Sequence, residues 1–393
     1  MGQPRPKQLD ETVDNIKHSG GFLQRNVPFV RSKIFGSPSE RHDHKSMSYW
    51  SKKYIGKHGE EISDTCVPEI SVSVHVVEWP ARDRVLRGRL YSPRDVSTFN
   101  GKLVVLYSGS GATAESYCLA MAVEYVYLGC KCLALDYQGF GASTSASYVY
   151  TKKSKKYESG ISKLKENNLL SDGIAMYNCA LNTVKKKKGN KSLFFKPKDI
   201  IIHGYSLGGP VASFTAYKAA CKNQKICGLI LDRIMPSVKE GVSMHGYPSV
   251  GGSLAKFVVG RLSVAAWLSK LRSIYDSVLL LVIAAGQLDP LSKFDTRIGF
   301  FAEVLGFKNA RREVVIDALH KDHSKVMRAT QNALKMIIQD DALNFANQHH
   351  VVSWSGHKKS LSTCDLSELT SMYLGGDNIS VAGSEIESVL SEF

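Results

Sequence analysis

Apolar and polar residues alternate along two early stretches of the chain, and a different pattern follows them. Residues 69–79 and 85–91 alternate on either side of a turn at 80–83, which predicts an antiparallel β-hairpin. Further along, apolar residues form short continuous runs at 102–107, 131–136, 199–203, 226–231, 277–284 and 312–316. Runs of this length are typical of strands that are buried on both faces of a parallel sheet.

Helical periodicity fills most of the intervals between these runs. Helices are expected at 114–128, 171–185, 207–220, 292–305 and 324–347, with Ser171 or Asp172 capping the second. Strands that alternate with helices predict an α/β protein, with a mostly parallel sheet flanked by helices. The segments 143–170 and 235–276 interrupt the alternation where strands end. We therefore expect lid or cap elements there, the main insertion being 235–276, with an apolar surface at 255–268.

Composition divides the chain into three expected regions. Residues 1–65 form a basic, partly ordered extension, residues 66–349 the α/β domain, and residues 350–393 an acidic tail. With 43% hydrophobic and 22% charged residues, wholesale disorder is excluded. The net charge is +15, but residues 360–393 contain six acidic residues and no Lys or Arg, so the preceding part carries +21. A charge of this size favours an anionic partner such as a membrane surface.

The cysteines and the longest apolar run indicate in which cellular compartment the protein acts. The eight cysteines form no CxxC pair and no zinc-ligand spacing, which predicts reduced, structural thiols and action in the cytoplasm. The longest uncharged apolar run, 278–288, is shorter than the roughly 20 residues that span a bilayer, so any membrane association is expected to be peripheral. The amino terminus lacks the apolar core of a secretory signal. His42–His44 is interpreted as a solvated turn, and no metal site is expected.

The strongest chemical signal is Gly204-Tyr205-Ser206-Leu207-Gly208, which lies between a predicted strand and a predicted helix. A serine on such a sharp turn is held in strained backbone angles, and glycines on either side avoid clashes with the strand and helix. The hydroxyl group then stands at the amino terminus of a helix, where amide groups stabilise negative charge. We therefore predict that Ser206 is a nucleophile.

A nucleophilic serine needs a histidine base, and the base needs a carboxylate that fixes its tautomer. Asp289 follows the apolar run at 277–284, and His320 follows the run at 312–316. His323, three residues further on, is an alternative base. The three predicted roles occur in the chain order Ser, Asp, His.

This order and placement resemble the α/β-hydrolase superfamily over residues 69–347. The turn at 136–143 is also similar to that superfamily's turn after its fourth strand. The resemblance implies an oxyanion hole made by backbone amides of Leu207 and of the loop after the 102–107 strand. Many relatives carry His-Gly in that loop, whereas this chain has Ser108-Gly109-Ser110-Gly111, and we assign the second amide to Ser110. The resemblance implies no cofactor.

These features predict a serine hydrolase that cleaves carboxylic esters, with acyl lipids as the favoured substrates. A thioesterase, a depalmitoylase, a peptidase or a catalytically inactive, basic membrane-binding protein are alternatives. Basic stretches without regularly spaced aromatic residues give no specific indication of nucleic acid. The acidic carboxyl end, 383–393, resembles the signals of bacterial effectors that a type IV system exports into a host cell. The oligomeric state stays open.

Overall fold

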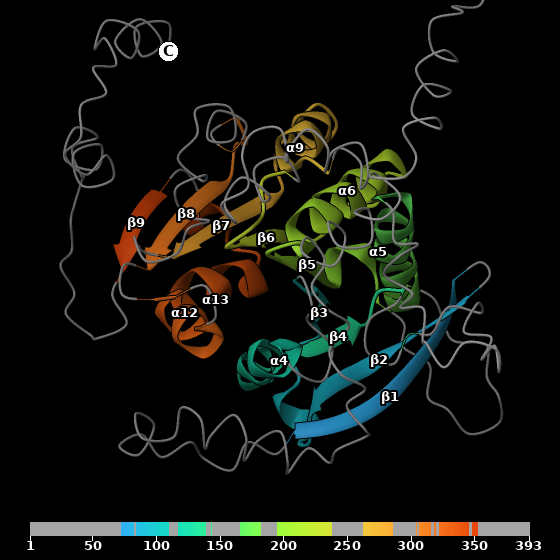
Figure 1. Ribbon diagram of the computed structural model, residues 1–393. Helices are drawn as coiled ribbons and strands as arrows, with labels where there is room; N and C mark the ends of the chain where they lie inside the picture. The colour runs from blue at the N-terminus through green and yellow to red at the C-terminus, as the bar shows by residue number, and fades with distance from the viewer. Residues whose placement is uncertain are drawn as a thin grey trace, which may run out of the picture. The chain divides into compact units, whose positions relative to one another are not determined.

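The computed structural model describes most of the chain between residues 72 and 352 (Figure 1). The described residues are 72–81, 84–109, 117–138, 143, 166–181, 195–237, 262–285, 304, 306–315, 318–319, 322–345 and 348–352. The chain divides into two units, 1–358 and 359–393, and every described residue belongs to the first. The expected amino-terminal extension, the His42–His44 turn and residues 353–393 lie outside the described part.

Nine strands of the described chain form one sheet, in the order β1-β2-β4-β3-β5-β6-β7-β8-β9. As predicted, β1 (Val72–Ala81) and β2 (Arg84–Pro93) form an antiparallel hairpin, and β2 continues antiparallel to β4 (Lys131–Leu135). Every pairing from β4 to β9 is parallel. The remaining strands are β3 (Leu103–Tyr107), β5 (Ile200–Tyr205), β6 (Gly228–Asp232), β7 (Leu279–Ala285), β8 (Ala310–Val315) and β9 (Gln348–Val352).

Helices cover both faces of the sheet (Figure 1). One layer is made of α5 (Glu166–Leu181), α6 (Gly208–Cys221) and α9 (Val264–Arg272). The other is made of α4 (Tyr117–Tyr127), α12 (His323–Ala329), α13 (Gln331–Gln339) and α14 (Ala342–Phe345). Two 3₁₀ turns, η1 (Val96–Thr98) and η3 (Pro197–Asp199), lead into β3 and β5. Within the described residues, no helix has the length and apolar character needed to cross a membrane.

The double covering explains why the central strands are continuous apolar runs. All side chains of β3, β5 and β6 are buried, and successive residues of each strand contribute alternately to the two cores. Leu103 and Val105 pack in the core under α5, α6 and α9, whereas Val104 and Leu106 pack in the core under α4, α12 and α13. Neither face of these strands contacts solvent, so no polar position is needed.

The predicted cap of the second helix is wrong. The helix already includes Glu166, so Ser171 and Asp172 lie inside it. The Asp172 side chain is fully buried and its carboxylate accepts a hydrogen bond from the backbone N–H of Gln138 at 2.8 Å. Asp172 thus joins α5 to the turn after β4 rather than starting the helix.

The prediction of a single helix at 324–347 is also wrong, because this region contains three helices and a strand follows it. Thr330, with φ −97° and ψ 9°, separates α12 from α13, and Asp340, in the left-handed region at φ 58°, ends α13. The strand β9 then begins at Gln348 and pairs with β8. The sheet therefore extends to Val352, beyond the expected domain boundary at 349.

The carboxyl part of the expected cap, 235–276, is an ordinary layer helix. Val264, Leu268 and Leu271 of α9 are fully buried, and Trp267 packs against Phe214 of α6 at a ring distance of 4.8 Å. The apolar residues at the end of 255–268 thus face the core and form no lid surface. Residues 238–261, where the rest of the cap was expected, lie outside the described part.

The six described cysteines are free thiols, as predicted. Five are buried, and only Cys221, at the end of α6, is exposed among them. Burial raises the pKa of Cys130 and Cys179 to about 12 and that of Cys227 to about 11. These thiols are therefore protonated and inert at neutral pH.

Candidate active site

Ser206 occupies the sharp turn between β5 and α6, and its backbone adopts the left-handed conformation at φ 52°. A side-chain carbon at Gly208 would collide with the carbonyl oxygen of Tyr107, and one at Gly204 would lie 2.5 Å from the carbonyl oxygen of Gly208. Only glycine fits at these two positions, because strand and helix approach so closely. The Gly-x-Ser-x-Gly pattern therefore marks a strained turn here, as predicted.

Hydrogen bonds from the neighbouring strand hold this strained conformation. The Ser206 N–H donates to the carbonyl of Asp232, the last residue of β6, at 3.1 Å. The Ser206 carbonyl accepts from the N–H groups of Gly209 and Met235, each at 3.0 Å. Residues on both sides of the turn after β6 thus fix the backbone of Ser206.

The loop after β3 packs directly against Ser206. A side-chain carbon at Gly109 would lie 2.8 Å from the Tyr205 ring and 3.1 Å from Cβ of Ser206, so this loop can approach only as glycine. Leu207, the first proposed oxyanion residue, follows Ser206 and is buried at the start of α6. Ser110, the second, follows Gly109 and lies outside the described residues.

Asp289 and His320 also lie outside the described residues, but the strands that precede them are described. β7 ends at Ala285, four residues before Asp289, and β8 ends at Val315, five residues before His320. Because β5, β6, β7 and β8 are parallel neighbours, their carboxyl ends share one edge of the sheet with Ser206.

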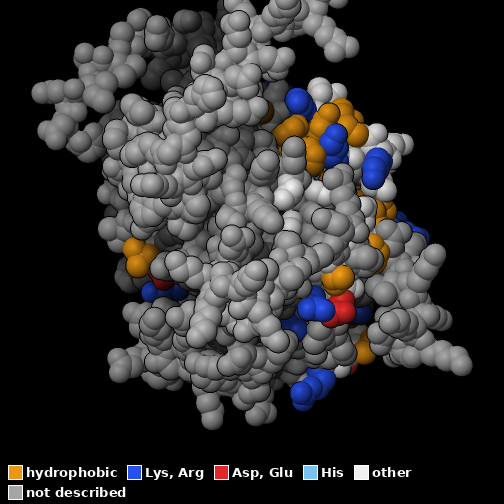
Figure 2. Space-filling view, turned by 45° about the vertical axis from the view of Figure 1, so that its right-hand side comes forward, with side chains coloured by type: hydrophobic (Ala, Val, Ile, Leu, Met, Phe, Trp, Pro, Cys, Tyr) orange, Lys and Arg blue, Asp and Glu red, His pale blue; other side chains and the backbone are white. Residues whose placement is uncertain are grey.

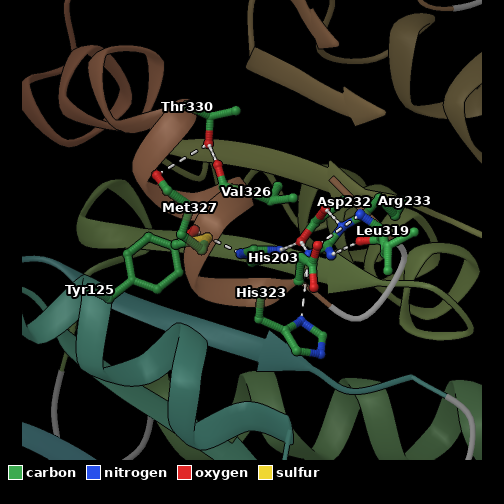
Figure 3. Close-up of polar contacts among 10 residues, drawn as sticks. Tyr125, His203, Asp232, Arg233, Leu319, His323, Val326, Met327 and Thr330 are labelled. Carbon is green, nitrogen blue, oxygen red and sulfur yellow. Dashed lines mark hydrogen bonds and ion pairs between the residues drawn. The ribbon is translucent and has the colours of Figure 1, made fainter. Parts of the chain in front are cut away.

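His323, the alternative base, begins α12 and is buried beside Arg233 (Figure 3). Its ring packs edge-on against the Tyr205 ring at a centroid distance of 4.6 Å. Its Nδ1 lies 3.5 Å from Nη2 of Arg233. A guanidinium group can only donate, so Nδ1 is the acceptor in this contact and the ring proton belongs on Nε2.

Arg233 and Asp232 form a fully buried ion pair at the end of β6. Arg233 Nε donates to Asp232 Oδ1 at 2.6 Å, and Nη2 donates to Oδ2 at 2.7 Å. Burial alone would raise the pKa of Asp232, but the adjacent Arg233 charge, its hydrogen bonds and His203 outweigh that effect and lower it. Asp232 is therefore ionised, and the pair is neutral overall.

His203 extends this polar cluster away from Arg233. Its Nδ1 lies 2.7 Å from the Tyr125 hydroxyl and its Nε2 lies 3.4 Å from Asp232 Oδ2 (Figure 3). His203 is a packed strand residue, with no exposed surface. Sequence reasoning did not single out Asp232 or Arg233. The one available signal was a charged Asp-Arg pair directly after the apolar run Gly-Leu-Ile-Leu.

Comparisons with known proteins agree with this architecture. No protein-family profile matches the chain. The crystal structure of an alpha-beta hydrolase (ABH) from Vibrio vulnificus superposes with a TM-score of 0.56 at 23% identity, over 79% of this chain and 92% of that one. The chain has the α/β-hydrolase fold. This confirms the expected fold class and the resemblance on which it was based.

Two curated proteins are similar to part of this chain in sequence. The chain is 33% identical over 215 residues to a Multifunctional-autoprocessing repeats-in-toxin of Vibrio cholerae serotype O1, and 34% identical over 181 residues to one of Vibrio vulnificus. The matches cover 54% and 45% of this chain but only 4% and 3% of the toxins. The chain therefore resembles one small segment of each toxin.

Proposed function

We propose that this protein is a serine hydrolase that cleaves acyl esters through a covalent acyl-enzyme. The observation that carries the proposal is the left-handed Ser206 at the carboxyl edge of the sheet, held by hydrogen bonds from the Asp232–Met235 turn. Strain of this kind costs about 1–3 kcal/mol and persists only where the surroundings enforce it, typically at functional sites.

In the proposed mechanism, Ser206 Oγ attacks the ester carbonyl while His320 accepts its proton. Asp289 orients His320 and stabilises the imidazolium that forms. Backbone amides of Leu207 and Ser110 stabilise the oxyanion, and His320 then protonates the leaving alcohol. A water molecule, activated by the same histidine, hydrolyses the acyl-enzyme and releases the acid. No cofactor takes part in these steps.

The surroundings of His323 favour His320 as the base. A triad histidine donates Nδ1–H to the carboxylate and accepts the serine proton at Nε2. His323 has the opposite arrangement, because its Nδ1 faces the Arg233 guanidinium. We therefore assign His323 a structural place beneath the site.

A fluorophosphonate probe tests the proposal, because only an activated serine reacts with it. We expect labelling at Ser206 and p-nitrophenyl ester turnover, with Ser206→Ala and His320→Ala each lowering kcat by about 10⁴-fold or more. The control is Ser273→Ala, which removes an exposed serine hydroxyl that donates to the Lys270 carbonyl at 2.8 Å. Labelling and turnover that survive Ser206→Ala would refute the proposal.

The substrate class is identified by a panel of substrates that differ in acyl chain length and in the bond that is cleaved. p-Nitrophenyl esters of increasing chain length, the corresponding thioesters and peptide anilides separate an esterase from a thioesterase, a depalmitoylase and a peptidase. We favour long-chain esters. A preference for thioesters or anilides would keep the triad and change the substrate class.

An aromatic and basic surface on α6 and α9 supports action at an anionic membrane. Lys270 lies 4.6 Å from the centre of the Trp267 ring, and Lys218 lies 5.3 Å from that of Tyr217, whose ring stacks on Trp267. Both lysines are exposed, and Figure 2 shows basic and hydrophobic side chains adjacent on the described surface. Aromatic rings with attached cations suit the boundary between acyl chains and anionic headgroups.

Vesicle sedimentation tests this part of the proposal. The Lys218→Glu/Lys270→Glu variant is expected to bind vesicles containing phosphatidylserine at least tenfold more weakly than the wild type, because each surface lysine contributes about 1 kcal/mol. Lys335→Glu, an exposed charge reversal on α13 in the opposite helix layer, is the control. Equal binding to neutral and anionic vesicles at low salt would remove the membrane from the proposal.

The toxin relatives support a place of action inside a host cell. Both similar segments belong to proteins named as toxins, and the acidic carboxyl end resembles a type IV export signal. We therefore propose an exported effector enzyme that acts in the host cytoplasm. Fusing the chain to a reporter that is active only in host cytoplasm tests delivery.

A further inference from the structure

Arg233 connects the turn that carries Ser206 with the residue that precedes His320. Its guanidinium carbon lies 5.0 Å from the centre of the Tyr205 ring, directly before Ser206. Its backbone N–H donates to the Ile283 carbonyl of β7 at 2.8 Å, which anchors the residue at the strand ends. Its Nη1 reaches the carbonyl oxygen of Leu319 at 3.5 Å. The Arg233 side chain therefore contacts residues at the ends of β5 and β6 and in the loop after β8. Figure 3 shows it between Asp232 and Leu319.

We propose that Arg233 is a positioning residue that holds the loop after β8 in register with the nucleophile. The inference rests on the proposed function, in which His320 is the base. Arg233 has no part in bond making, since its side chain is fully buried. It acts by fixing Leu319, and thereby the start of the peptide that leads into His320.

A contact to the sheet matters for Leu319 because core packing does not hold this residue. The Leu319 side chain is 47% exposed. Its backbone is held instead by polar contacts: its N–H donates to the Asp322 carboxylate at 3.0 Å, and its carbonyl accepts from the Asp322 N–H at 3.1 Å. These two bonds tie Leu319 to its own loop. The Arg233 contact ties that loop to the sheet.

The fork of the guanidinium group makes this arrangement possible. Nε and Nη2 bind Asp232, which neutralises the buried charge, while Nη1 points to Leu319 and Nη2 also faces His323. A lysine could keep the ion pair with Asp232, but its single ammonium group cannot reach all these acceptors in fixed directions. Arg233→Lys therefore separates the charge from the positioning role.

The kinetic test compares Arg233→Lys with Arg311→Lys. Arg311 is a matched control, because it is also buried and its Nε donates to Glu313 at 2.7 Å, but it lies near the start of β8. A misplacement of about 1 Å can cost about 100-fold in rate. We expect Arg233→Lys to lower kcat for a p-nitrophenyl ester by about 10–100-fold with KM changed less than about threefold, and Arg311→Lys to leave both within about twofold. An unchanged kcat in Arg233→Lys, or an equal loss in both variants, would overturn the proposal.

Hydrogen exchange tests the positioning without any catalysis. The backbone amide hydrogens of residues 316–322 should exchange at least about tenfold faster in Arg233→Lys than in Arg311→Lys. The two variants are compared under conditions that give them the same free energy of unfolding. If the wild type hydrolyses no ester, the proposed function fails, and this exchange experiment decides the Arg233 role by itself.

Should Arg233→Lys not fold, the charge-neutral Asp232→Asn/Arg233→Gln variant replaces it, with Arg311→Gln/Glu313→Gln as its control. Equal exchange in the two members of either pair would refute the role.

Discussion

Two buried arginine–carboxylate pairs shift the pKa of their acids in opposite directions. Asp232 receives two hydrogen bonds from Arg233 and has His203 beside it, whereas Glu313 receives its bond from Arg311 Nε at 2.7 Å. Burial favours the neutral form of both acids. At Asp232 the surrounding charges outweigh burial and lower its pKa, but at Glu313 burial prevails over Arg311 and raises the pKa. The first carboxylate is therefore well satisfied in its charged form, and the second is not.

The largest expected effect is the contrast between Asp232→Asn and Glu313→Gln. Removing one partner of a well-paired buried ion pair costs about 3–5 kcal/mol, because the other charge is left without compensation. Asp232→Asn should therefore lower the free energy of unfolding by that amount in urea titrations. Glu313→Gln should lower it by less, because burial already disfavours the charged form of this acid and part of the pairing is lost in the wild type. Equal losses would show that the donors around Asp232 add nothing.

A smaller effect is expected from the hydroxyl group at the far end of the Asp232 cluster. Tyr125→Phe removes the group that lies 2.7 Å from His203 Nδ1 and should cost about 1–3 kcal/mol in unfolding free energy. Tyr177→Phe is the control, since the buried Tyr177 hydroxyl has no hydrogen-bond partner within the described part of the chain. A stability loss in the control that matches Tyr125→Phe would show that the bond to His203 is not responsible.

The smallest effect is the pH dependence of the two pairs. Because the pKa of Glu313 is raised from 4.5, its native proton favours folding at low pH, and this stability is lost as pH rises from 4.5 through the raised pKa. Glu313→Gln should therefore gain stability relative to the wild type across that window, by about 1 kcal/mol for each pH unit. The Asp232 contribution has the opposite sign: it is present above pH 3.8 and is lost as pH falls through the lowered pKa. Urea titrations of Glu313→Gln and the wild type at pH 4 and pH 7 test the first window, and titrations of the wild type below pH 3.8 test the second. A constant difference between Glu313→Gln and the wild type from pH 4 to pH 7 would contradict the assignment.

The sequence predicted the central strands and the serine turn because their local signals coincide with their surroundings. Continuous apolar runs occur only where both faces are covered, and the glycines at 204 and 208 are needed for close contact between strand and helix. These requirements act over a few residues. They can therefore be recognised without knowing the rest of the fold.

Features that depend on pairing across the sheet could not be predicted in this way. The strand β9 begins Gln-His-His, so its pattern lacks the apolar run that marked the other parallel strands, and pairing with β8 alone defines it. The buried Asp232–Arg233 pair looks like the solvated end of a strand until β5 and β6 are aligned with Tyr205 opposite Asp232. The breaks at Thr330 and Asp340 likewise carry no glycine or proline.

The exposed thiol of Cys221 allows a fluorophore to be attached at the end of α6, away from the turn that carries Ser206. The other five described thiols are buried and protonated, so a maleimide reagent should modify Cys221 first within that part of the chain. The 14 residues of α6 separate Cys221 from Ser206 by about 21 Å. A fluorophore at Cys221 and an acceptor carried by a phosphonate on Ser206 would then form a donor–acceptor pair along a single rigid helix. Energy transfer between them would report phosphonylation of Ser206 in real time.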